Sequence, residues 1–127
     1  MLIHSCLTVS SVANASLIFE TILGFDLLYT FDIDAQVLNT LFHVNQPAHA
    51  RVYELGNTRL EIFVMPDMPR PGPLQHICIG VPDRDAVVDR FASAGMNVRR
   101  VERNDGCVIF CIDHDGNLYE LKPTSEC

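Results

Sequence analysis

The sequence lacks long hydrophobic runs and is poor in basic residues. No apolar stretch approaches the roughly 18 residues that a membrane-spanning helix requires, so we expect no membrane association. Only 9 Lys and Arg residues stand against 16 Asp and Glu, which gives a formal net charge of −7. Because contact with a phosphate backbone needs clustered cations, this balance argues against nucleic acid as a partner.

Export signals and cysteine motifs are missing as well. The chain begins without a basic segment before its first apolar stretch, and no plausible cleavage site follows, so we predict a cytoplasmic location. The number of cysteines is odd, and their spacing matches neither a zinc finger nor a redox motif. We expect all five to be reduced thiols: Cys6, Cys78, Cys107, Cys111 and Cys127.

What remains is the composition of an ordinary globular protein. Of the 127 residues, 48% are hydrophobic and 20% are charged. A chain of this length buries about two-thirds of its surface on folding, which is enough without disulfides or a structural metal. These values exclude disordered, collagen-like and coiled-coil chains, and they indicate a single domain over residues 1–127.

An internal repeat divides this domain into two halves. Residues 2–9 and 74–81 both alternate in the manner of a strand, and both place His third and Cys fifth. Each strand is followed by an amphipathic helix that ends at a glycine, Gly24 in the first half and Gly95 in the second. The predicted helix stripes are Ala15, Ile18, Phe19 and Ile22, and then Val87, Val88 and Phe91 with Asp83 as N-cap.

Further strands follow each helix. The predicted strands are 27–33, 50–55 and 59–64 in the first half, and 97–101, 108–112 and 118–122 in the second. Gly56-Asn57 and Asp115-Gly116 fit tight hairpin turns because these residues tolerate positive φ. Each half therefore reads β-α-β-β-β, and the fold class is α+β with two tandem βαβββ modules.

The segment between the halves is rich in proline. Pro66, Pro69, Pro71 and Pro73 would not be accepted inside a strand, so residues 66–73 are predicted to link modules 1–65 and 74–122. The first half is longer because of residues 34–47. We predict a short inserted helix there, capped by Asp34 and closing one side of the sheet, with these residues inside: Val37, Leu38, Leu41 and Phe42.

Four polar residues occupy equivalent positions in the two halves. His4 and His76 lie on the predicted first strands, and Glu61 and Glu120 on the last, each on the face away from the helix. A single strand histidine is usually a hydrogen-bonded core residue, and a single glutamate usually lies at a rim. If the sheets curve around a shared face, however, two imidazoles and two carboxylates suit Zn²⁺, Ni²⁺, Co²⁺, Fe²⁺ or Mn²⁺.

The chain resembles the vicinal oxygen chelate superfamily, which includes glyoxalase I, methylmalonyl-CoA epimerase, extradiol dioxygenases and the fosfomycin- and bleomycin-resistance proteins. The resemblance covers residues 2–122. It rests on Ile-His-Ser-Cys-Leu-Thr-Val at 3–9, Ile-Leu-Gly-Phe at 22–25, Leu-Glu-Ile at 60–62, Gln-His-Ile-Cys-Ile-Gly-Val at 75–81, and Asp-His-Asp-Gly-Asn-Leu-Tyr-Glu-Leu at 113–121.

This resemblance implies a metal-bearing cleft between the modules with His4, Glu61, His76 and Glu120 as ligands. It favours a glyoxalase I-like, lactoylglutathione lyase-related enzyme that chelates a small substrate through vicinal oxygens, with Zn, Ni or Co as the metal. Glu120 first and Glu61 second would move a proton between adjacent carbons, as in a lyase or isomerase. The resemblance further implies a homodimer, with the site built within one chain or across two.

Two alternatives stay open at this stage. A dioxygenase or transferase on the same fold would use three ligands, His4, His76 and Glu120, with Fe or Mn. A metal-free member would bind an antibiotic-like small molecule. Thr8 and Met65 stand where glyoxalase I of the short bacterial type has Arg and Asn for glutathione, which argues against lactoylglutathione as the substrate.

Two polar groups outside this set have alternative interpretations. His49, Arg51 and Tyr53 share one face of a predicted strand, and they line the cavity or form a solvated outer face. The run that contains Arg99, Arg100 and Arg103 meets an anionic substrate group or is a solvated strand end.

Overall fold

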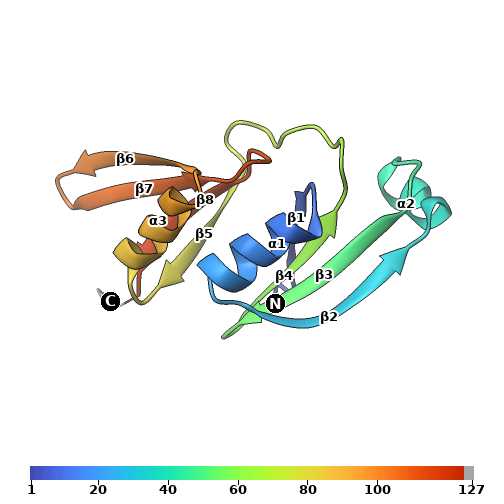
Figure 1. Ribbon diagram of the computed structural model, residues 1–127, viewed down its shortest axis with the longest axis horizontal. Helices are drawn as coiled ribbons and strands as arrows, with labels where there is room; N and C mark the ends of the chain where they lie inside the picture. Colours follow the sequence, from blue (N-terminus) through green and yellow to red (C-terminus); the bar gives the residue numbers. More distant parts are fainter. Residues whose placement is uncertain (125–127) are drawn as a thin grey trace. The chain divides into compact units, whose positions relative to one another are not determined.

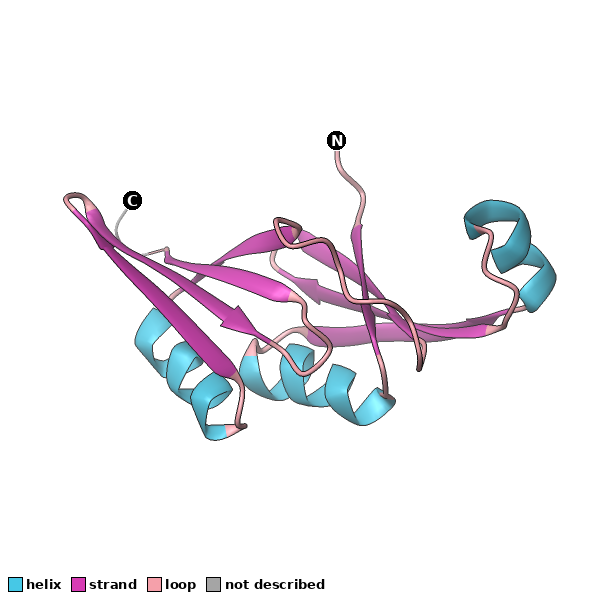
Figure 2. Ribbon diagram, turned by 90° about the horizontal axis from the view of Figure 1, so that it is seen from above, coloured by secondary structure: helices cyan, strands magenta, loops and turns pink. Residues whose placement is uncertain are grey.

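The computed structural model describes residues 1–124 and divides into two compact units, Met1–Met68 and a second that begins at Pro69 (Figure 1). Each unit contains one four-stranded mixed sheet. In Figure 2, the helix that follows the first strand of each unit lies along one face of that unit's sheet. The predicted α+β fold with two repeated modules is therefore confirmed. Cys127, expected to be a reduced thiol, lies outside the described residues.

Unit 1 is a βαβαββ unit whose first and last strands are neighbours. Its elements are β1 (Ser5–Val9), α1 (Val12–Ala15), the π-helical segment η1 (Ser16–Ile22), β2 (Asp26–Ile33), α2 (Ala35–Phe42), β3 (Ala48–Leu55) and β4 (Thr58–Val64). The strand order is β1-β4-β3-β2, with β1 parallel to β4 and the other neighbours antiparallel. Side chains from the two ends of the unit therefore lie side by side in the sheet.

Unit 2 repeats this arrangement without the inserted helix. Its elements are β5 (His76–Val81), α3 (Arg84–Ser93), β6 (Asn97–Arg103), β7 (Gly106–Ile112) and β8 (Leu118–Pro123). The strand order is β5-β8-β7-β6, and again the first and last strands, β5 and β8, are parallel. The predicted hairpin between β7 and β8 pairs as expected.

The core of each unit lies between the helix and one face of the sheet. Phe19 packs on Tyr53 of β3 with ring centroids 5.3 Å apart, and Phe91 packs on Tyr119 of β8 at 5.6 Å. All four aromatic side chains are fully buried. The predicted helix stripes are confirmed, since each of their residues is buried: Ala15, Ile18, Phe19, Ile22, Val87, Val88 and Phe91.

The helix ends also agree with the caps that the sequence predicts. The Asp83 carboxylate accepts a hydrogen bond from the backbone N–H of Ala86, as an N-cap should. Gly24 and Gly95 follow the two helices with φ of +75° and +80°, a conformation that other residues rarely adopt. The first helix departs from the expectation in one respect: its second part is π-helical, with the N–H of Leu23 bonded to the carbonyl of Ile18.

The first strand of each unit is shorter than predicted. β1 begins at Ser5 rather than residue 2, and β5 begins at His76 rather than residue 74. Leu2 and Ile3, which belong to the predicted strand but precede β1, are both exposed. His4 therefore precedes its strand by one residue, whereas His76 opens its strand.

The inserted helix α2 exists, but its predicted interior is mostly wrong. The Asp34 side chain caps it by accepting from the N–H of Val37. Of the four residues expected inside, only Leu38 is buried, and Val37, Leu41 and Phe42 are exposed. One face of this short helix packs on the sheet end, where Leu38 joins a cluster with Ala48, Ala50, Phe63 and Met65. In the part of the chain described, no helix is both long and apolar enough to cross a membrane.

Candidate functional site

In unit 1, a histidine and a glutamate meet on the sheet face that α1 and η1 leave uncovered. Glu61 of β4 is flanked in register by Cys6 of β1 and Val52 of β3, so these side chains share a face. This face is opposite that of Tyr53, which packs on the helix. His4 Nε2 lies 3.4 Å from Glu61 Oε2. The Glu61 side chain is 17% exposed and the imidazole 43%, so a largely buried carboxylate faces an accessible ring.

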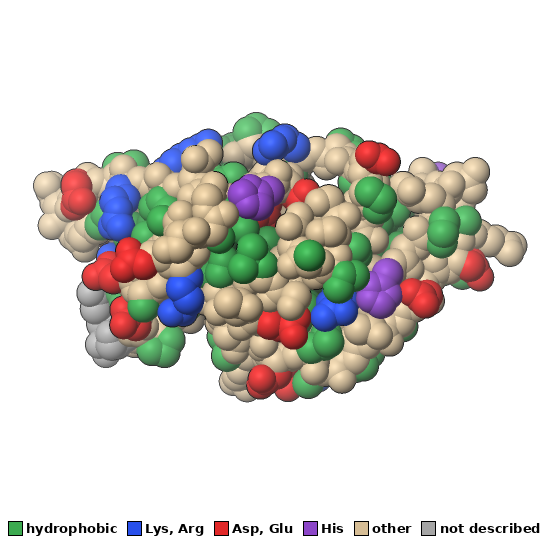
Figure 3. All heavy atoms as spheres, viewed as in Figure 1, with side chains coloured by type: hydrophobic (Ala, Val, Ile, Leu, Met, Phe, Trp, Pro, Cys, Tyr) green, Lys and Arg blue, Asp and Glu red, His purple; other side chains and the backbone are tan. Residues whose placement is uncertain are grey.

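Unit 2 reproduces the same pair in the same register. Glu120 of β8 lies between Cys78 of β5 and Phe110 of β7. His76 Nε2 lies 3.4 Å from Glu120 Oε1, with side chains 37% and 17% exposed. The ring of Phe110 lies beside that of His76, with centroids 5.0 Å apart. Histidine side chains also reach the surface on the molecular face drawn in Figure 3.

A backbone contact assigns a proton to one nitrogen of His76. Nδ1 lies 2.9 Å from the carbonyl oxygen of Leu74, and since a carbonyl only accepts, Nδ1–H donates. In a neutral imidazole, Nε2 then presents a lone pair to the Glu120 carboxylate, which is unfavourable unless a cation lies between them. A proton or a metal ion supplies that cation. A histidine whose second nitrogen donates to a backbone carbonyl is typical of metal ligands.

The neighbouring thiols are not thiolates at neutral pH. Desolvation by burial and the nearby Glu61 carboxylate raise the pKa of Cys6 to about 11. Desolvation and the Glu120 carboxylate also raise the pKa of Cys78. The repeated cysteines therefore act as neutral side chains beside the two pairs, and the nitrogen and oxygen donors are the better cation ligands.

The structure brings the four predicted site residues together in two pairs, one within each unit. Among residues 1–124, no group of three or more His, Cys, Asp or Glu side chains has the geometry of a metal site. Each unit by itself offers one imidazole and one carboxylate. The assignment of all four residues to a single metal stays a prediction.

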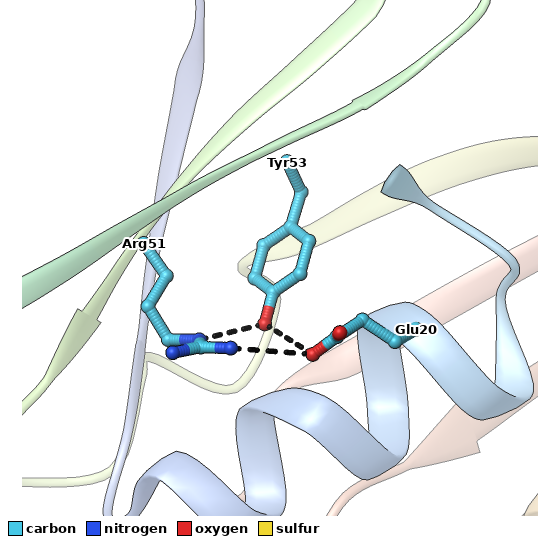
Figure 4. A network of polar contacts seen from close by, with 3 residues as sticks. All are labelled: Glu20, Arg51 and Tyr53. Atoms are coloured by element: carbon cyan, nitrogen blue, oxygen red, sulfur yellow. Dashed lines mark hydrogen bonds and ion pairs between the residues drawn. The ribbon is translucent and has the colours of Figure 1, made fainter. Parts of the chain in front are cut away.

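A second polar cluster lies on the helix side of unit 1 (Figure 4). Tyr53 donates its hydroxyl to Glu20 Oε2 at 3.0 Å and accepts from Arg51 Nε at 2.8 Å, while Arg51 Nη2 lies 3.3 Å from the same Glu20 oxygen. Desolvation raises the pKa of Glu20, but hydrogen bonds from Ser16, Tyr53 and Arg51 outweigh it and leave that pKa below its usual value. Because Tyr53 is buried under the helix, it neither lines the cavity nor belongs to a solvated face, and both sequence interpretations are wrong for it.

The turn before Glu120 contains a buried carboxylate that the sequence did not reveal as structural. Asp113 Oδ1 accepts from the backbone N–H groups of Asp115 and Asn117 at 2.9 Å, and Oδ2 accepts from the Asn117 amide at 2.9 Å and the Tyr119 hydroxyl at 2.8 Å. These four bonds fix the turn and the start of β8. They hold the strand that carries Glu120.

Comparison with known proteins identifies the fold. The model of the Glyoxalase/Bleomycin resistance protein/Dioxygenase superfamily matches residues 2–121. A glyoxalase family protein from Enterococcus faecalis is 22% identical, with a TM-score of 0.69 and 95% of each chain covered. The trypanothione-dependent glyoxalase I of Leishmania major is 19% identical, with a TM-score of 0.74 over 99% of this chain and 88% of that one.

A third similar structure carries a metal. The fosfomycin resistance protein FosX from Listeria monocytogenes, in complex with Mn(II) and a dihydroxypropylphosphonic acid, is 17% identical, with a TM-score of 0.71. The alignment covers 95% of this chain and 90% of that one. No curated protein sequence matches the chain. At these identities the structural matches establish the fold alone.

Proposed function

The chain belongs to the Glyoxalase/Bleomycin resistance protein/Dioxygenase superfamily, and we propose that it is a divalent-metal-dependent enzyme of the glyoxalase I-like type. Its four ligands are His4, Glu61, His76 and Glu120, contributed by one chain or by two copies of a homodimer. Its substrate is a small molecule with two oxygens on adjacent carbons. A cytoplasmic location and lyase or isomerase chemistry complete the proposal.

One observation carries this proposal: the same histidine–glutamate contact occurs in both units. The Nε2-to-carboxylate distance is 3.4 Å in each, and the glutamates occupy equivalent register positions. Two largely buried carboxylates, each facing an imidazole nitrogen, form a donor set that a divalent cation satisfies. FosX, which shares the fold, was crystallised with Mn(II), and this supports a divalent metal here.

When bound, the metal would polarise the two substrate oxygens and stabilise the negative charge that develops on them. Glu120 acts as the base that removes a proton from a carbon next to these oxygens and returns it to the neighbouring carbon. Glu61, in the equivalent position of unit 1, is the second candidate. His76 is held in orientation by the Leu74 carbonyl and keeps Nε2 directed at the site.

The equivalent geometry of the two glutamates favours four ligands over three. A His4, His76 and Glu120 enzyme, with Fe or Mn and dioxygenase or transferase chemistry, would leave the Glu61 carboxylate without a cation beside His4. The four-ligand set with Zn, Ni or Co uses both carboxylates. A metal-free binding protein would not require either pair.

Lactoylglutathione is not the proposed substrate. Met65 is buried in the apolar cluster with Leu38 and offers no hydrogen-bonding group. Thr8 pairs in register with Phe63 and carries no positive charge for a glutathione carboxylate. We therefore propose glyoxalase I-like chemistry on a different small molecule.

The decisive experiment is the metal content per chain, by elemental analysis of protein purified without chelator or nickel resin. We expect about one equivalent of a transition metal in the wild type and in His114→Ala, a control at an exposed turn position, and loss of the metal in His76→Ala. Zn, Ni or Co would support the isomerase, whereas Fe would support the three-ligand oxygenase. No metal, and no uptake on reconstitution, would leave only the metal-free binding protein.

A further inference from the structure

The two sheets carry the same histidine–glutamate pair but different side chains around it. In unit 2, Arg99 of β6 pairs with Phe110, which in turn pairs with Glu120, so all three share the face of the pair. In unit 1, the equivalent position on β2 is Tyr29, which pairs with Val52 beside the glutamate. An aromatic residue in one unit is therefore replaced by a guanidinium in the other.

At two more positions on this face, unit 2 has a cationic residue where unit 1 has an apolar one. Lys122 follows Glu120 by two residues, and its Nζ lies 3.8 Å from Glu120 Oε2, where unit 1 has Phe63. Arg103 lies four residues after Arg99 on β6, so the two side chains share a face. The equivalent of Arg103 in unit 1 is Ile33. The face that carries the His76–Glu120 pair thus has three cations, in a chain whose net charge is −7.

The two arginines of this set are available to a ligand. Arg99, Arg103 and Lys122 are all exposed. Within residues 1–124, no carboxylate lies within the 4.0 Å ion-pair distance of either guanidinium. An incoming anion would meet Arg99 without displacing a protein carboxylate.

We propose that the substrate carries an anionic group, a carboxylate or a phosphate, which Arg99 binds with support from Lys122 and Arg103. This inference rests on the proposed metal site at His76 and Glu120. Adjacent strands are about 4.8 Å apart, which places the Arg99 backbone about 10 Å from that of Glu120. The anion is therefore separated by several bonds from the two oxygens that the metal chelates. Arg99 is a specificity-determining residue, and it takes no part in proton transfer.

Two probes of equal length test this on metal-loaded protein. Hexanohydroxamate and the monohydroxamate of adipate both chelate through two adjacent oxygens, but only the second ends in a carboxylate. We expect the wild type to bind the adipate probe about fivefold more tightly, the value of one exposed charge pair. Arg99→Gln should lose this preference. Arg100→Gln should keep it, because Arg100 pairs with Ile109 and lies on the opposite face of the same strand.

The outcomes separate the two proposals. Equal binding of both probes by the wild type, or equal losses in Arg99→Gln and Arg100→Gln, overturns the anion site and leaves the metal site standing. Failure of the neutral probe to bind loaded wild-type protein overturns both. If Arg99→Gln proves unfolded in a thermal scan, the wild-type comparison decides, and a preference that disappears in high salt supports the anion site.

Discussion

One hydrogen bond distinguishes the two histidines of the candidate site. Nδ1 of His76 donates to the carbonyl of Leu74, whereas the structure shows no such backbone contact for His4 among the described residues. His4 also lies outside its strand, and His76 opens one. A ligand that is already oriented loses less conformational entropy when it binds a metal. The two histidines occupy equivalent positions in the repeat, but only His76 is held in orientation before a metal binds.

We therefore expect His76→Ala to weaken metal binding more than His4→Ala, by about tenfold, which is within the range of lost orienting contacts. Competition with a chromogenic chelator gives both dissociation constants. Equal losses would show that the Leu74 contact does not preorganise the site. The same titration of Glu61→Gln and Glu120→Gln tests the ligand number, since a three-ligand site would tolerate the first change and a four-ligand site would tolerate neither.

Burial on both faces of β3 explains why the sequence analysis misassigned Tyr53. Alternation along β3 correctly places Arg51 and Tyr53 on one face, but Val52 on the other face is equally buried. When both faces of a strand are covered, the period of two no longer identifies the face that takes the helix. Glu20 and its contacts with Arg51 and Tyr53 depend on the approach of η1 to the sheet, which no local pattern encodes.

At the scale of elements, the β7–β8 turn depends on one buried carboxylate. Asp113 is 4% exposed and accepts four hydrogen bonds, among them the Tyr119 hydroxyl. Burial and the Asp113 carboxylate raise the pKa of Tyr119 well above 10, so its hydroxyl remains a donor. The sequence predicted a hairpin turn here, and residues 113–121 are one of the motifs on which the family resemblance rests. The internal hydrogen bonds that make the turn a rigid support for Glu120 are visible only in the structure.

Replacing Asp113 by Ala should lower the free energy of unfolding by about 3 kcal/mol or more, because it leaves buried donors unsatisfied. Urea unfolding measures the change. His114→Ala, the adjacent and exposed residue of the same turn, should change the stability by less than about 0.5 kcal/mol. Similar small effects for both variants would contradict the structural role of Asp113.

Helix α2 shows where element-level prediction fails. Its cap and its existence follow from Asp34 and a helical apolar spacing, which are local signals. Apolar spacing also predicted four buried residues, but only Leu38 is buried, and Leu41 remains 65% exposed. Burial depends on the surface that a partner element offers, and β3 and β4 offer this helix only the small cluster around Ala50. The repeat, in contrast, predicted the two sheets well, because each half confirmed the other.

For the whole molecule, alkaline pH should be destabilising. Burial raises the pKa of Cys111 from 9.0 to about 11, and burial and Glu61 do the same for Cys6. Between pH 9 and 11 the unfolded chain loses thiol protons that the folded chain keeps, so the folded state is disfavoured as the pH rises. Below about pH 8, where the thiols are protonated in both states, these groups have almost no effect on the pH dependence.

Urea midpoints at pH 8, 9 and 10 should therefore fall slightly from pH 8 to 9 and more steeply from pH 9 to 10. Cys111→Ala removes one of the titrating groups, and its midpoint should fall less steeply over the same range, whatever its stability at pH 8. A slope identical to that of the wild type would show that Cys111 does not contribute.

The parallel pairing of β1 with β4 and of β5 with β8 has a consequence for how the protein is made. On the ribosome, His4 emerges long before Glu61, and His76 long before Glu120, because each pair joins the opposite ends of a unit. Neither pair forms until the last strand of its unit has closed the sheet, a long-range step of the kind that slows folding. A metal ion with one of these pairs among its ligands would therefore bind only after that unit had finished folding. Metal uptake would then be one of the last steps in the production of the protein.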